Sequence, residues 1–173
     1  FHDSSLKRMA GMNQAIKELT LDEVKSIELI NGGKIPLLSE ALENFPDLRF
    51  NIDIKTEEAL EGSIRIIKEM NSFKRTCLAS FSSSRLERIR KLAGPDACTS
   101  SGQMDIFKIM CRSIGIKSQE TKGHCAQIPI RQWGVPVLTK RFMDVAKRER
   151  KLVHVWTIDE KQQMFDLIDL GVD

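Results

Sequence analysis

The chain has 173 residues, of which 41% are hydrophobic and 29% charged, and its formal net charge at pH 7 is +3. This composition is ordinary for one soluble globular domain. It does not favour a nucleic-acid-binding module, which usually carries a larger positive excess on one face. No apolar run approaches the roughly 20 residues that a membrane-crossing helix needs, so stable membrane insertion is not expected.

Cysteine usage and the chain start give weak hints about the compartment. Cys77, Cys98, Cys111 and Cys125 show neither CxxC spacing nor the density of a disulfide scaffold. Reduced and mostly buried thiols of this kind favour a cytoplasmic setting. No signal peptide is visible, but the chain begins at Phe1, so we expect the native N-terminus to lie upstream.

In chain order, the sequence predicts strands that alternate with helices. Phe1-His2-Asp3 resembles the end of a strand, and Thr20 with Glu23 forms a capping box that begins a short helix. The other elements follow from hydrophobic periodicity and from glycine and proline positions: helices over 36–45, 56–70, 82–92, 104–114, 138–150 and 159–170, and strands over 50–55, 76–81, 97–100, 124–130 and 152–157. A turn is expected around 133–136, and 171–173 looks like a helix terminator that leads into another strand.

Repeated strand–helix units predict an α/β fold built on parallel strands. Four or five units with incomplete ends favour a TIM (β/α)8 barrel over a doubly wound sheet. We therefore expect residues 1–173 to form one partial barrel domain that lacks the first two βα units and the last strand. No sequence repeat or linker divides the chain.

The strand over 50–55 carries the most informative polar residues. Phe50, Ile52 and Ile54 alternate with Asn51, Asp53 and Lys55, so the polar residues face away from the helices. Two residues along a strand span about 6.6 Å, so Asp53 and Lys55 are spaced to hold a metal ion and an anionic group side by side. A structural ion pair on a solvated strand face is the alternative.

In a barrel, chemistry is concentrated at the carboxyl ends of the strands. The residues predicted there are His2, Asp3, Asp53, Lys55, Ser80, Phe81, Ser100, Ser101 and Trp156. They include an acid or base, a ligand for a hard metal, a cation and an aromatic wall. From the residues alone, a histidine at a chain end such as His2 is more often a frayed surface residue than a catalytic one, and Asp3 fits a cap for the following loop at least as well as a partner for His2.

Six segments, taken in order, resemble the glycerophosphodiester phosphodiesterase family. Phe1-His2-Asp3 is similar to the family's "FHD", Ile35 to Leu42 to "IPTLEEVL", Asn51 to Lys55 to "NIEIK", Ala79 to Phe81 to "SSF", Val155 to Asp159 to "VWTVN", and Leu170 to Asp173 to the start of "LGVDGIITD". These matches are collinear and span nearly the whole chain.

The resemblance implies a barrel enzyme that uses Ca²⁺ or Mg²⁺ to hydrolyse small glycerophosphodiesters to an alcohol and glycerol 3-phosphate. It assigns His2 as one of two acid/base histidines and Asp53 as a metal ligand. Lys55 would lie near the phosphate, Trp156 would wall the glycerol pocket, and Phe81 would contact the substrate. The family's "HRG" and "ELD" motifs would precede Phe1, so we expect activity only from the parent protein. Asp53 stands where the family usually has glutamate, a side chain longer by about 1.5 Å.

Two other functions stay open. One is a non-catalytic barrel that serves as a binding or scaffold protein, and the other is a related phospholipase D-type activity on lysolipids. The basic run Lys147-Arg148-Glu149-Arg150-Lys151 does not favour nucleic acid as a partner, because cations at the C-terminal end of a helix are accounted for by the helix dipole.

Overall fold

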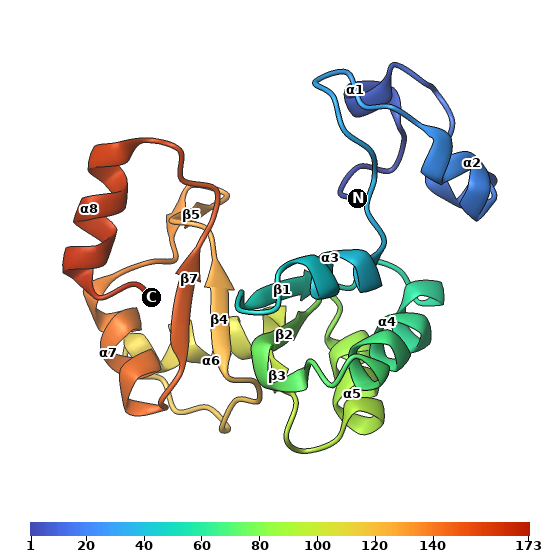
Figure 1. Ribbon diagram of the computed structural model, residues 1–173. Helices are drawn as coiled ribbons and strands as arrows, with labels where there is room; N and C mark the ends of the chain where they lie inside the picture. Colours follow the sequence, from blue (N-terminus) through green and yellow to red (C-terminus); the bar gives the residue numbers. More distant parts are fainter. The chain divides into compact units, whose positions relative to one another are not determined.

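The computed structural model describes residues 1–173, which divide into two units, residues 1–46 and residues 47–173. The second unit contains the expected strand–helix series (Figure 1). Its strands are β1 (Phe50–Asp53), β2 (Thr76–Ala79), β3 (Cys98–Thr99), β4 (Cys125–Ile128) and β7 (Leu152–Val155). Its helices are α4 (Glu58–Glu69), α5 (Ser83–Ala93), α6 (Gln103–Ser113), α7 (Lys140–Arg148) and α8 (Lys161–Leu170), with a 3₁₀ turn over Phe73–Arg75.

All of the pairings among these strands are parallel. β1 pairs with β2 and β2 with β3, while β4 pairs with β7. A parallel bridge between Ser100 and Cys125 joins β3 to β4, so the strands follow one another in chain order. Sequential parallel strands connected by helices are the arrangement of a (β/α)8 barrel, and the predicted fold class is confirmed.

Side chains from strands that are not neighbours meet on one face of this array. Gln127 Nε2 on β4 donates to Asn51 Oδ1 on β1 over 2.8 Å. The sulfurs of Cys77 on β2 and Cys125 on β4 are 3.3 Å apart, although β3 lies between these strands. Such contacts require the strands to curl toward one another, as they do in a barrel wall. The face that carries Asn51 is therefore concave.

The opposite, convex face is covered by helices and holds an apolar core. Val153 on β7 and Ala126 on β4 are buried against Phe142 of α7 and Ile109 of α6. Val155 packs against the same cluster, so alternate residues of β7 face the helices as predicted. α4 lies beside α5, and α6 lies beside α7.

The first unit contains only short helices: α1 (Lys7–Ala10), a 3₁₀ turn over Ile16–Glu18, α2 (Leu21–Ser26) and α3 (Leu38–Asn44). The predicted capping box begins α2, since Glu23 N donates to Thr20 Oγ1 and Thr20 N donates to Glu23 Oε2. The expectation that Phe1–Asp3 end a strand is wrong. Asp3 instead turns toward Arg8, whose guanidinium donates to both of its carboxylate oxygens, and the chain bends there.

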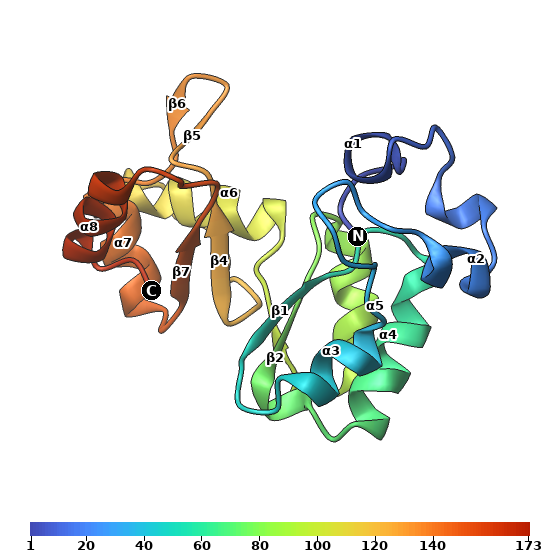
Figure 2. The same ribbon diagram turned by 45° about the horizontal axis from the view of Figure 1, so that its top comes forward.

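Two features complete the second unit. The expected turn at 133–136 is an antiparallel hairpin made by β5 (Arg131–Gln132) and β6 (Val135–Pro136), and it projects from the rest of the unit (Figure 2). At the other end, Gly171 closes α8 with φ +93°, and Asp173 N donates to Val153 O over 2.9 Å. Gly171 is thus the helix terminator that the sequence predicts. No helix has both the length and the apolar character needed to cross a bilayer.

Candidate active site

Asp53 and Lys55 meet where β1 ends. Asp53 is the last residue of the strand, and Lys55 Nζ donates to its Oδ2 over 2.7 Å. The other oxygen, Asp53 Oδ1, is buried and has no hydrogen-bond partner. A buried carboxylate oxygen is costly to leave without a partner. The pair therefore offers one free acceptor beside a cation, which suits a ligand that brings its own positive charge or donor.

An aromatic pair lies beside these charges. The ring of Phe81, which follows β2, contacts the ring of Trp156, which follows β7, edge to face with centroids 5.8 Å apart and planes at 84°. Lys55 Nζ is 6.0 Å from the Phe81 ring centroid, within cation–π range. Residues from the ends of β1, β2 and β7 thus converge, as expected at the carboxyl edge of a barrel. Sequence position alone did not show that the two rings touch.

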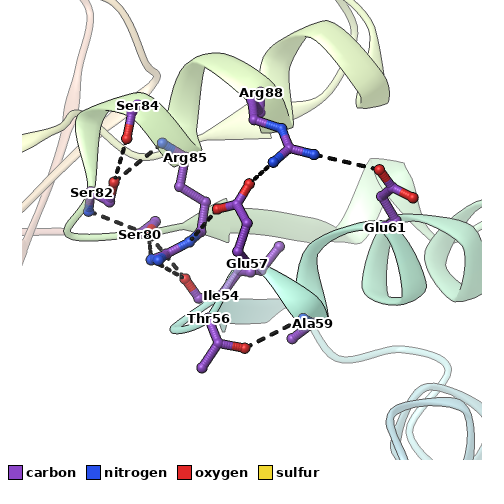
Figure 3. Close-up of polar contacts among 10 residues, drawn as sticks. All are labelled: Ile54, Thr56, Glu57, Ala59, Glu61, Ser80, Ser82, Ser84, Arg85 and Arg88. Atoms are coloured by element: carbon purple, nitrogen blue, oxygen red, sulfur yellow. Dashed lines mark hydrogen bonds and ion pairs between the residues drawn. The ribbon is translucent and has the colours of Figure 1, made fainter.

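The residues that directly follow β1 and β2, Ile54 and Ser80, are tied together by Arg85 of α5 (Figure 3). Arg85 Nη1 donates to Ile54 O over 3.2 Å and to Ser80 Oγ over 3.0 Å, and Ser80 Oγ donates to Ile54 O over 2.9 Å. Ile54 lies between the two charged residues, and Ser80 directly precedes Phe81. The guanidinium therefore fixes the ends of β1 and β2 relative to each other.

Arg85 is itself held by an acidic residue, Glu57, which directly precedes α4. Its Nε donates to Glu57 Oε2 over 3.3 Å, and Arg88 also pairs with Glu57. Arg88 extends the network to Glu61 at 3.4 Å (Figure 3). The Arg85 side chain is 18% exposed and Glu57 43%, so the ion pair lies partly in solvent while the contacts to Ile54 and Ser80 lie inside.

Three thiols occupy the concave face one layer deeper than Asp53. Cys77 and Cys125 are in contact, and hydrogen bonds from Cys125 and Cys77 lower the pKa of the Cys98 thiol. All four cysteines are free, with Cys125 buried and the others half-buried. These side chains fill the interior below the polar edge of the array.

His2 lies in the first unit, in an open hollow lined also by Asp3, Ser4, Ser5, Lys7 and Arg8. Its Nδ1 is 2.9 Å from Asp3 Oδ1, and its side chain is 79% exposed. The Arg8 guanidinium, with a smaller contribution from His2, holds the pKa of the Asp3 carboxyl well below its usual range. An ionised Asp3 that accepts from Nδ1–H leaves Nε2 as the ring nitrogen open to a ligand.

The donors available for a metal ion are limited. The orphaned, buried Asp53 Oδ1 fits the role of a ligand for a hard divalent cation. Residues 1–173 nevertheless contain no group of three or more histidine, cysteine, aspartate or glutamate side chains arranged to hold a metal. These residues therefore supply one fitting ligand and not a complete site.

Comparison with known proteins agrees with this architecture. The model of the glycerophosphoryl diester phosphodiesterase family matches residues 1–173. The chain belongs to this family. A curated relative from Mycobacterium tuberculosis, "Probable glycerophosphodiester phosphodiesterase 2", is 32% identical over 177 residues, which cover 99% of this chain and 67% of the relative.

Solved structures of phosphodiesterases share the fold of this family member. A glycerophosphodiester phosphodiesterase from Parabacteroides distasonis superposes with a TM-score of 0.70 at 23% identity, over 100% of this chain and 70% of that chain. A phosphodiesterase from Oleispira antarctica, solved in complex with the product sn-glycerol-3-phosphate, gives a TM-score of 0.71 at 19% identity, over 100% and 72% of the two chains.

Of the five residues that the sequence singled out, the second unit brings four together: Asp53, Lys55, Phe81 and Trp156. His2 lies in the other unit. Arg85 was missed, because one arginine in a helix of mixed charge carries no signal of a long-range partner. The only available hint was Ser80, which the sequence did place at a strand end.

Proposed function

We propose that the protein hydrolyses glycerophosphodiesters to an alcohol and glycerol 3-phosphate. The proposal rests on membership of the phosphodiesterase family and on one observation of the site: the unpartnered Asp53 Oδ1 beside the Lys55 ammonium and the Phe81–Trp156 pair. A glycerophosphodiester has an anionic phosphate next to an uncharged glycerol. The site has complementary groups for both parts.

In this proposal each residue has a separate task. The Lys55 ammonium binds a phosphate oxygen. The Phe81 and Trp156 rings form a wall of the glycerol pocket through their apolar faces. His2, oriented by Asp3, moves a proton at Nε2, because the hydrolysis must deliver a proton to the leaving alcohol. Asp53 contributes one ligand to a divalent ion, Ca²⁺ or Mg²⁺, which when bound would neutralise charge on the phosphate.

The alternative function is a non-catalytic binding barrel. It is favoured by one observation, the lack of any group of three metal-ligating side chains within residues 1–173. The two functions differ in whether product forms, and both predict that a glycerophosphodiester binds near Lys55. A product assay therefore separates them.

The decisive experiment measures glycerol 3-phosphate release from glycerophosphocholine by the full natural protein that contains this chain, with and without Ca²⁺ or Mg²⁺. Asp53→Asn keeps the shape of the side chain and removes its charge, and we expect it to lower the metal-dependent rate about a hundredfold or more. His2→Ala is expected to lower the rate by about a hundredfold to ten-thousandfold, the usual worth of a general acid or base.

Asp144→Asn is the matched control, since Asp144 is an exposed aspartate on α7, away from the strand ends. Its rate should equal that of the natural protein. If the folded protein forms no product with either ion but still binds glycerophosphocholine, the enzyme hypothesis is wrong and the non-catalytic binding function is supported. If Asp53→Asn and Asp144→Asn lower the rate equally, Asp53 has no specific role in the reaction.

A further inference from the structure

The hairpin formed by β5 and β6 presents a tryptophan to solvent. Trp133 and Gly134 occupy the two turn positions with φ +48° and +79°, a turn type that closes two-residue hairpins. Arg131 Nη2 donates to Gly134 O over 2.6 Å and locks the turn. The Trp133 side chain is 94% exposed, the largest exposure among the large hydrophobic residues.

The base of the hairpin is anchored by hydrogen bonds and by burial. Val137 N and Leu138 N both donate to Ile130 O, over 2.9 and 3.2 Å. Val137 is 4% exposed and belongs to the same apolar cluster as Ile128 and Phe142. The hairpin therefore projects from a base that is bonded into the unit (Figure 2), with Trp133 in its turn.

The hairpin leaves the array at the edge where the candidate site lies. Two residues separate it from β4, which ends at Ile128, and Ile128 O accepts from Trp156 N over 3.2 Å. β4 and β7 end in register, with Ile128 opposite Val155. A surface that bound the hairpin tip would thus face the same edge of the strands as Trp156.

The charged side chains in the segment that carries the hairpin have one sign. Residues 121–143 contain no aspartate or glutamate and include four cations, Lys122, Arg131, Lys140 and Arg141. Arg131, Lys140 and Arg141 are all exposed. Arg131 lies in the hairpin, and the other two begin α7 directly after it.

From these features we propose that the β5–β6 hairpin is a peripheral docking element for membranes with anionic lipids. Tryptophan favours the boundary between lipid head groups and acyl chains, because its ring is apolar and its N–H is polar. Lysine and arginine beside it are attracted to the negative surface of anionic lipids. One projecting indole beside cations, in a segment without acidic residues, therefore matches an anionic lipid surface.

The test uses the fact that the chain has two tryptophans. In a variant of the full protein in which Trp156 and every tryptophan outside residues 1–173 are changed to Phe, Trp133 alone reports by fluorescence. We expect vesicles of phosphatidylcholine mixed with phosphatidylglycerol to shift its emission to shorter wavelength and to sediment the protein. Pure phosphatidylcholine vesicles should do so far less, and added salt should weaken the binding.

Co-sedimentation with vesicles then tests the hairpin itself, in folded variants that retain Trp156. Trp133→Ala should weaken binding to anionic vesicles by about tenfold or more, and Arg131→Ala by roughly fivefold. Ile114→Ala, a change at another exposed apolar residue that follows α6, should bind as the natural protein does.

Three results would overturn the proposal. The first is that anionic vesicles leave the emission of Trp133 unchanged. The second is that Trp133→Ala binds anionic vesicles as tightly as the natural protein does. The third is a blue shift that appears with rising protein concentration and without lipid, accompanied by a dimer in analytical ultracentrifugation. That result would assign the hairpin to self-association. None of these readouts depends on hydrolysis, so they stand apart from the proposed activity.

Discussion

Lys151 shows how a single residue departs from its sequence pattern. It closes a basic run at the end of α7, where solvated cations are expected, and Lys147 and Arg148 are indeed exposed. Lys151, however, is 8% exposed. Its Nζ donates to Gly123 O over 2.7 Å, and to Thr121 O and Lys122 O over 3.3 and 3.4 Å. The ammonium therefore holds the loop that leads into β4.

Burial lowers the pKa of Lys151, which gives the stability of the fold a defined pH dependence. The charged form is disfavoured in the folded state, so folding is penalised at neutral pH. As pH rises through the lowered pKa toward about 10.4, the folded state loses the proton first and the penalty fades. The free energy of unfolding of the natural protein should therefore rise relative to Lys151→Met in this window, by at most about 1.4 kcal/mol per pH unit.

Urea unfolding of both proteins over the alkaline range measures this difference. Lys147→Met provides the control, since it removes an exposed lysine of α7. A difference between Lys151→Met and the natural protein that stays flat from neutral to alkaline pH would show that burial does not perturb this ammonium.

At the scale of the elements, helix α5 controls the ends of β1 and β2 through one side chain. Arg85 reaches Ile54 O and Ser80 Oγ, which flank the residues proposed to bind substrate. Arg88, one turn further along, pairs with Glu57 and Glu61 and touches neither strand end. The two arginines thus lie in the same helix and share Glu57 as a partner, but only Arg85 contacts the ends of β1 and β2.

We predict that Arg85→Met lowers kcat for the proposed hydrolysis about tenfold to a hundredfold, because small displacements of positioning groups cost this much. Arg88→Met, the matched control, should keep the natural rate. Arg85→Lys should recover little, since an ammonium does not reproduce the forked donors. Fluorescence of Trp156, in a protein whose Trp133 and any tryptophan outside residues 1–173 are changed to Phe, gives a readout independent of activity, and it should change with Arg85→Met only. Equal effects of the two methionine variants would contradict a positioning role.

The contacts of α5 also show which features of the fold can be predicted from the sequence and which cannot. Local patterns located β1, α4, β2 and α5, because alternation, amphipathic spacing and glycine breaks are set by near neighbours. Polar residues in phase on β1 placed Asp53 and Lys55 on one face. The contacts of Arg85 with Ile54, 31 residues away, and of Phe81 with Trp156 depend on the curl of the sheet. No local pattern encodes that curl.

At the scale of the whole second unit, the seam between β3 and β4 joins two parts of the sheet. The seam consists of residues 99–101 and 123–125: His124 N donates to Thr99 O, and Ser101 N donates to Cys125 O, both over 2.7 Å. Gly123 passes so close to Ser100 that a Cβ there would lie 2.5 Å from Ser100 O. The continuity of the barrel wall therefore depends on a residue without a side chain.

Gly123→Ala is accordingly expected to destabilise the protein strongly. Gly123 and Gly115 share φ +88°, but a Cβ at Gly115 would meet no atom within 4 Å. Gly115→Ala should therefore cost only the backbone strain, about 1 kcal/mol. Gly123→Ala adds a clash with backbone that cannot move without opening the seam, so we expect a total of about 3–5 kcal/mol. Urea denaturation of the two variants measures both costs. If Gly123→Ala lost no more than Gly115→Ala, the two parts of the sheet would not depend on this close approach, and the seam would tolerate separation of β3 from β4.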